Sequence, residues 1–117
     1  MAIDLSKLKA LELPKKEISA EVLGETQKLT ISAYGDDIAL SISDICENYK
    51  SDSERRVWCM LLEECANMTA EDAELYVSMD LAGASGVVNQ IHKLTAEFRK
   101  MRKEAREAAK KKSNPAT

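Results

Sequence analysis

Three cysteines and a single histidine are the side chains with most to offer chemically, and together they match the ligand count of a structural zinc site. Their spacing argues against such a site, because the chain contains no Cys-x-x-Cys pair. On a helix, Cys59 and Cys65 point about 120° apart, and only Cys65 shares a face with the apolar Val57 and Leu61. We therefore expect free thiols, no metal and no cofactor.

The other residues that could take part in catalysis are isolated from one another. His92 has no second histidine and no paired nucleophile in a recognisable motif. Adjacent carboxylates such as Glu63 and Glu64 diverge by about 100° on a helix, which suits solvated faces better than acid–base catalysis. The segment 83–86 lacks the Gly-Lys-Ser/Thr ending of a P-loop and the third glycine of a dinucleotide fingerprint. We expect a protein that is not an enzyme.

Length and composition predict one globular domain. The chain has 117 residues, of which 44% are hydrophobic and 32% charged. No apolar run approaches the ~20 residues that span a bilayer, and the first residues lack the pattern of a signal peptide. An odd number of cysteines without framework spacing is typical of a reducing cytoplasm. We expect no membrane association.

Charge is distributed unevenly along the chain. Residues 36–80 contain twelve acidic and three basic side chains, whereas residues 99–112 contain eight basic and two acidic ones. Such a dipole favours head-to-tail contacts between copies, or an acidic partner for the basic end. The overall net charge of −3 disfavours nucleic acid as that partner. The basic end comprises Arg99, Arg102, Lys103, Arg106, Lys110, Lys111 and Lys112.

The elements that position these side chains begin with a predicted β-hairpin. Apolar residues alternate with polar ones over 18–22 and again over 29–33, and the segment 24–27 between them has hairpin-loop length. Residues 1–14, with leucines at 5, 8, 11 and 13, are expected to form an arm before the hairpin.

The segments after the predicted hairpin have apolar residues at helical spacing. Apolar side chains at 38, 42, 45 and 49 favour a helix capped by Asp36 or Asp37, although alternation over 38–42 also permits a third strand and a shorter helix from Ser43. A second helix is predicted from Ser53 to 66, and a third begins after Thr69 as its N-cap. The glycines at 83 and 86 are expected to break or kink the chain.

A strict heptad stripe marks a last, long helix over residues 87–112. The fold class is therefore mainly α (α+β), with a hairpin followed by three to four helices in a single domain over 1–112 and a mobile tail at 113–117. The stripe either packs on the preceding helices or forms an open face for a partner or a second copy. Its members, which we expect at a partner or oligomer interface, are Val87, Ile91, Leu94, Phe98 and Met101, followed by Ala105 and Ala108.

This arrangement resembles the tail assembly chaperones of long-tailed bacteriophages. The resemblance covers residues 13–112 and lies in the short N-terminal hairpin, the acidic helices and the long basic helix with its lysine run. It implies a non-enzymatic protein of the host cytoplasm. Such a protein binds the tape measure protein, keeps it soluble and helps recruit tail tube subunits.

Two further expectations accompany the resemblance. Many members of that family are made in two lengths by a −1 ribosomal frameshift, and an A-rich codon run for residues 110–112 would suit such a shift. The charge dipole and the apolar stripe together predict a homo-oligomer whose copies line up along the client. The alternative function is a small interaction or regulatory module whose basic helix contacts nucleic acid or an acidic protein.

Overall fold

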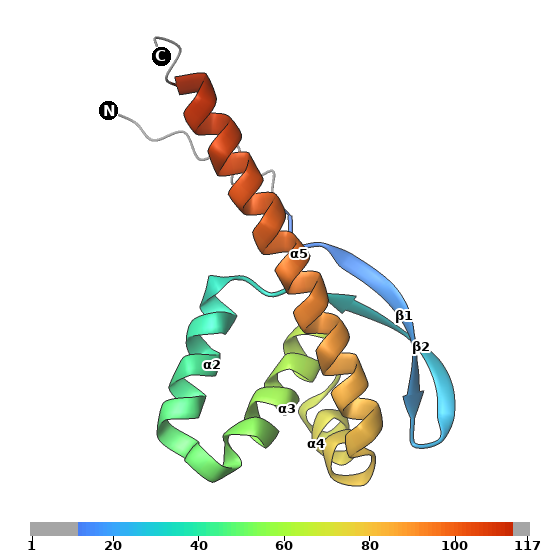
Figure 1. Ribbon diagram of the computed structural model, residues 1–117. Helices are drawn as coiled ribbons and strands as arrows, with labels where there is room; N and C mark the ends of the chain where they lie inside the picture. The colour runs from blue at the N-terminus through green and yellow to red at the C-terminus, as the bar shows by residue number, and fades with distance from the viewer. Residues whose placement is uncertain (1–11, 114–117) are drawn as a thin grey trace.

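The computed structural model describes residues 12–113 and shows a β-hairpin followed by four α-helices, the last of them long (Figure 1). The predicted fold class is confirmed. Most of the expected arm and tail, residues 1–11 and 114–117, lie outside the described residues. The elements are β1 (Lys15–Val22), β2 (Glu25–Ser32), α2 (Asp36–Tyr49), the short 3-10 helix η1 (Lys50–Asp52), α3 (Ser53–Cys65), α4 (Ala70–Met79) and α5 (Leu81–Ser113).

The hairpin closes through a turn of two residues. β1 and β2 are antiparallel, with Ile18 opposite Leu29. The turn is Leu23-Gly24, so the predicted loop over 24–27 was too long and β2 already begins at Glu25. Leu23 has φ 54° and Gly24 has φ 84°, as a type I′ turn requires at both central positions. Glycine adopts positive φ without strain, whereas leucine rarely does, which is why the sequence did not indicate this turn.

Asp80 joins the hairpin turn to the start of α5. Its Oδ2 accepts a hydrogen bond of 3.1 Å from the backbone N–H of Leu23, and its Oδ1 accepts one of 3.0 Å from the N–H of Gly83. A carboxylate at a helix N-terminus satisfies free N–H groups and interacts favourably with the helix dipole. The same side chain thus caps α5 and holds the strained residue of the turn.

α5 runs without interruption through Gly83 and Gly86, so the expected break over 83–86 was wrong. The reason lies in tertiary packing. A Cβ at Gly83 would collide with the backbone oxygen of Glu21 and come within 2.6 Å of the Asp80 carboxylate. Glycine at 83 therefore lets α5 approach β1 closely, and it does not end the helix.

The observed helix starts agree only partly with those predicted from the sequence. α2 is helical over residues 38–42, which excludes the alternative strand there. Its N-cap is Gly35, with no side-chain cap, and Asp36 and Asp37 lie in the first turn instead of capping it. The cap at Thr69 is confirmed, because its Oγ1 accepts a 3.1 Å hydrogen bond from the N–H of Asp72.

α5 is the central element of the core. The hairpin packs against it, and α3 and α4 also contact it, while α2 packs mainly on α3 and contains no buried residue (Figure 1). The largest fully buried side chains come from β2, α3 and α5. They are Ile31, Leu61, Leu62, Val87, Val88, Ile91 and Thr95.

The C-terminal part of α5 projects from this core. The helix has 33 residues, about 50 Å at 1.5 Å per residue, in a molecule that measures 59 × 33 × 22 Å. Phe98 is the last buried residue of α5 among those whose exposure the structure describes. We call residues 12–98 the head and residues 99–113 the stem (Figure 1).

Candidate protein-interaction surfaces

Most of the predicted interface stripe lies inside the head. Val87, Ile91, Leu94 and Phe98 are between 0% and 7% exposed and belong to one hydrophobic cluster with the hairpin and α3. The expectation of an open face was therefore wrong for these four residues, and the alternative of packing within the chain holds for them. The physical reason is that elements on more than one side of α5 cover its stripe, which helical spacing alone does not reveal.

The stripe continues on the stem, where the described part of the chain does not bury it as the head does. Met101 is 45% exposed, and Ala105 and Ala108 are exposed as well. We call these three residues the stem seam. Because alanine is small, a second helix could approach the seam closely and pack against Met101.

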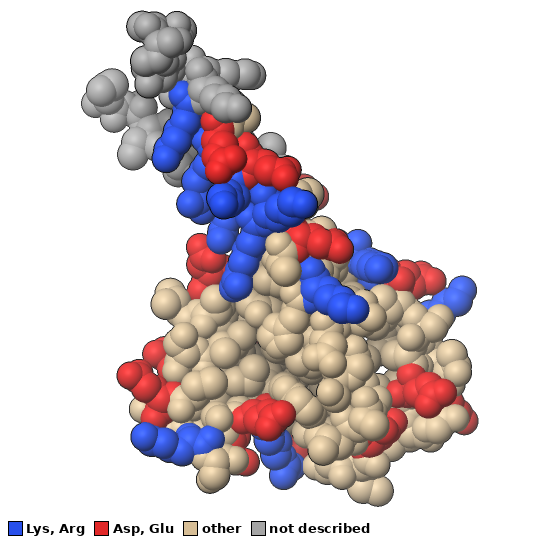
Figure 2. Space-filling view, viewed as in Figure 1, with Lys and Arg blue, Asp and Glu red and all other residues tan. Residues whose placement is uncertain are grey.

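The predicted basic end surrounds the rest of the stem. Figure 2 shows cationic groups gathered where α5 leaves the head. Arg102 is held by an ion pair of 3.0 Å between its guanidinium and Asp36 at the start of α2. The side chains of Lys111 and Lys112 lie outside those that the structure describes. The exposed members are Arg99, Lys103, Arg106 and Lys110.

These four cations are spaced by four, three and four residues, so they form a line along one face of the helix, whereas Lys100, which is also exposed, lies off this line. We call this line the basic stripe. Lys103 is two residues after Met101, about 200° round the helix axis. The stem is therefore amphipathic, with its apolar seam and its basic stripe on opposite faces.

The outer face of α2 carries a second stripe, which the sequence analysis did not single out. Asp37, Leu40, Asp44 and Glu47 are spaced by three, four and three residues and are all exposed, Leu40 by 68%. We call them the acidic stripe. In Figure 2, acidic groups appear along the edge of the head formed by α2. The 3–4 spacing of these residues is visible in the sequence, but the isoleucines of the inner face have the same kind of spacing and give the stronger apolar pattern.

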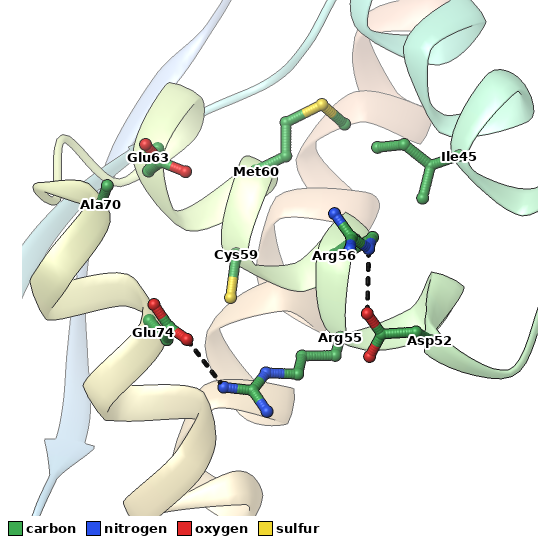
Figure 3. Close-up of a pocket in the computed structure, with 9 residues that line it drawn as sticks. All are labelled: Ile45, Asp52, Arg55, Arg56, Cys59, Met60, Glu63, Ala70 and Glu74. Atoms are coloured by element: carbon green, nitrogen blue, oxygen red, sulfur yellow. Dashed lines mark hydrogen bonds and ion pairs between the residues drawn. The ribbon is translucent and has the colours of Figure 1, made fainter. Parts of the chain in front are cut away.

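A groove of about 630 Å³ lies between α2, α3 and α4 (Figure 3). Apolar atoms from Ile45 and Met60 line it together with two ion pairs. One pair joins Arg55 to Glu74 at 3.0 Å, and the other joins Arg56 to Asp52 at 2.9 Å. These two ion pairs thus largely neutralise the charges that line the groove.

Two of the three thiols, those of Cys59 and Cys65, are not activated as nucleophiles. Cys59 lies in the groove, and its partial burial raises its pKa although the neighbouring Arg55 opposes this shift. Burial also raises the pKa of Cys65, while Cys46 is exposed. A raised pKa keeps the thiol protonated at neutral pH and makes it a poor nucleophile. Among residues 12–113, no group of three or more His, Cys, Asp or Glu side chains is arranged to hold a metal ion.

His92 belongs to a structural hydrogen-bond network on α5. Its Nδ1 lies 2.9 Å from the hydroxyl of Tyr34, whose backbone N–H donates to Oγ1 of the buried Thr95. Burial, together with the cation of Arg99, lowers the pKa of His92, and burial raises the pKa of Tyr34. Both groups are therefore neutral at pH 7, and the phenol can donate to Nδ1. The network fixes the segment between β2 and α2 on α5.

No helix within residues 12–113 is both long and apolar enough to cross a membrane. Comparisons with protein families, curated proteins and solved structures found no match for this chain. The surfaces described above are therefore the basis for assigning a function.

Proposed function

We propose that the protein is a non-enzymatic tail assembly chaperone of a long-tailed bacteriophage, acting in the host cytoplasm. It binds the tape measure protein, keeps that protein soluble and helps recruit tail tube subunits. The family resemblance of the sequence supplies the identity of the client, and the stem supplies a surface suited to it.

The observation that carries the proposal is the exposed stem seam. Apolar surface on a long helical client is aggregation-prone when it is exposed, and a narrow seam on a projecting helix can cover it by helix–helix packing. Met101 supplies the largest side chain, and Ala105 and Ala108 allow close approach. Because the stem extends away from the head, a client helix can lie along it without displacing the core.

The test is co-expression with the tape measure reading frame of the genome that encodes this chain. We compare Met101→Lys with Glu107→Gln, since both raise the net charge by one and both introduce good helix formers. Burial of a methionine side chain contributes roughly 1.5–3 kcal/mol. Met101→Lys should therefore weaken client binding roughly 10- to 100-fold, and the client should become insoluble.

The control, Glu107→Gln, lies on a different face of the stem and should keep the client soluble. A client that stays equally soluble with Met101→Lys would contradict the proposal. So would a wild-type chain that does not change the client's solubility. If the wild type instead retains duplex DNA in a salt-dependent way and leaves the client insoluble, the alternative of a nucleic-acid-binding module is favoured.

A further inference from the structure

β1 runs along the face of α5 that carries the stem seam, and it runs in the opposite direction to the helix. Near the end of the strand, the backbone oxygen of Glu21 lies so close to Gly83 that a Cβ there would collide with it. Near the middle of the strand, Ile18 lines a surface pocket together with Gln90. Gln90 is eleven residues before Met101, so the two lie within about 20° on one face of the helix. Followed backwards, β1 therefore leads along this face toward the stem.

The described chain begins beside α5, close to the base of the stem. Pro14 directly precedes β1, and its carbonyl oxygen accepts a 2.9 Å hydrogen bond from the N–H of Ala33. The next residue, Tyr34, donates its backbone N–H to Oγ1 of Thr95 at 3.2 Å. Thr95 is six residues, or about 9 Å, before Met101 along the helix axis. In Figure 1 the first blue part of the chain accordingly lies close to α5 where the stem begins.

The length of chain before this point matches the length of the seam. Eleven residues precede the described range, and we call residues 1–11 the N-terminal segment. From Phe98 to Ala108 the helix rises about 15 Å. Eleven residues span about 16 Å as a helix and up to about 36 Å when extended, so either conformation reaches the end of the seam.

The N-terminal segment has the apolar side chains to cover the seam. Its sequence is MAIDLSKLKAL, with leucines at 5, 8 and 11. Leu13, where the described chain begins, is 41% exposed, and Met101 is 45% exposed. A contact between the leucines and the seam removes apolar surface of both from water.

The charges beside the seam also suit this segment. Glu97 and Glu104 are exposed and lie about 40° and 60° from Met101, on the same flank of the seam. The N-terminal segment carries the opposite charge at Lys7 and Lys9. Opposite charges favour approach of the segment along this flank, whereas the basic stripe on the far face of the stem repels its lysines.

We propose that the N-terminal segment packs on the stem seam of its own chain until the client displaces it. The contact deepens the proposed function, on which it rests for its role. A covered seam binds the client with an affinity reduced by the fraction of molecules in which the seam is open. Weakly binding apolar surfaces are thereby excluded, and only a longer apolar helix competes successfully. Because so small a contact opens readily, a bound client still adds protection to the stem.

Hydrogen exchange of the purified chain without any client tests whether the segment covers the stem. Leu5→Asp with Leu8→Asp removes the apolar contact. Ala2→Asp with Ser6→Asp makes the same change in net charge within the same segment and is the control. Amides across residues 99–110 should exchange at least threefold faster in the leucine variant than in wild type, and the control should exchange like wild type.

A disulfide tests whether segment and seam belong to the same molecule. Cys46→Ser first removes the exposed native thiol. Leu8→Cys with Ala105→Cys then places one thiol in the segment and one on the seam. Mild oxidation at micromolar concentration should join them within one chain, which migrates as a compact monomer on a non-reducing gel. The matched pair Leu8→Cys with Lys103→Cys, on the opposite face of the stem, should react at least tenfold more slowly.

Three results would overturn the proposal. The first is equal exchange across the stem in wild type and the leucine variant, and the second is equal reaction of the two cysteine pairs. The third is a disulfide that forms mainly between two chains. A client that stays insoluble with the wild type, while the exchange and disulfide results hold, would refute the proposed function and leave this contact standing.

Discussion

Two glycines three residues apart on α5 should respond to alanine in opposite directions. In an exposed helix interior, Gly→Ala stabilises by up to about 1 kcal/mol through helix propensity. A Cβ at Gly86 meets no atom within 4 Å, so Gly86→Ala should show that gain. A Cβ at Gly83 would collide with the backbone oxygen of Glu21 and lie 2.6 Å from an oxygen of Asp80.

The collision at Gly83 involves backbone, so β1 and α5 must separate to relieve it. That movement strains the hydrogen bond of 2.6 Å from the Tyr76 hydroxyl to the Glu21 oxygen and the contacts of Asp80 with the turn. Overpacking costs about 1–3 kcal/mol, and one weakened hydrogen bond adds about 0.5–1.5 kcal/mol. After subtracting the propensity gain of about 1 kcal/mol, Gly83→Ala should destabilise by roughly 0.5–3.5 kcal/mol.

Thermal unfolding followed by circular dichroism measures both effects. At about 4–5 °C per kcal/mol for a domain of this size, Gly83→Ala should lower Tm by roughly 2–17 °C. Gly86→Ala should raise Tm by about 2–5 °C. If both variants raise Tm equally, the close approach of α5 to β1 is wrong, and Gly83 would have no packing role.

Two other variants test the tertiary contacts. Asp80→Ala removes the cap of α5 and the acceptor for the N–H of Leu23, so it should lower the free energy of unfolding by about 1–3 kcal/mol. Urea unfolding measures this effect. The control Asp44→Ala should change the free energy of unfolding little. The pKa of His92 is lowered in the folded chain, so the unfolded chain binds the proton more readily and stability should fall as pH drops below about 6.5. In His92→Gln the loss of stability caused by protonation of His92 should vanish. If the urea midpoints of variant and wild type depend on pH identically, His92 does not contribute to the pH dependence.

Local patterns predicted the elements well because their physical causes are local. Alternation over 18–22 and 29–33 identified the hairpin, and steps of three and four identified α2 even though 38–42 also alternates. The cap at Thr69 depends on residues within one turn, and it formed as expected. These features need only neighbours in sequence.

The features that the sequence did not reveal depend on residues far apart in the chain. Gly83 is required by the approach of β1 sixty-two residues earlier, and Arg102 pairs with Asp36 sixty-six residues away. The heptad stripe shows which face of α5 is apolar, but not that the head covers Phe98 and leaves Met101 exposed. For the candidate site, the residue types were therefore predictable, whereas the division between core and surface was not.

Hydrogen exchange of the chain, measured with and without the proposed tape measure client, shows whether the stem binds that client. Amides in an exposed, projecting helix exchange through local opening of low free energy, so binding there adds protection that is easily measured. We expect added protection across residues 99–110 on client binding, and we expect Met101→Lys but not Glu107→Gln to abolish it. Protection confined to the groove between α2, α3 and α4, with the stem unchanged, would contradict it.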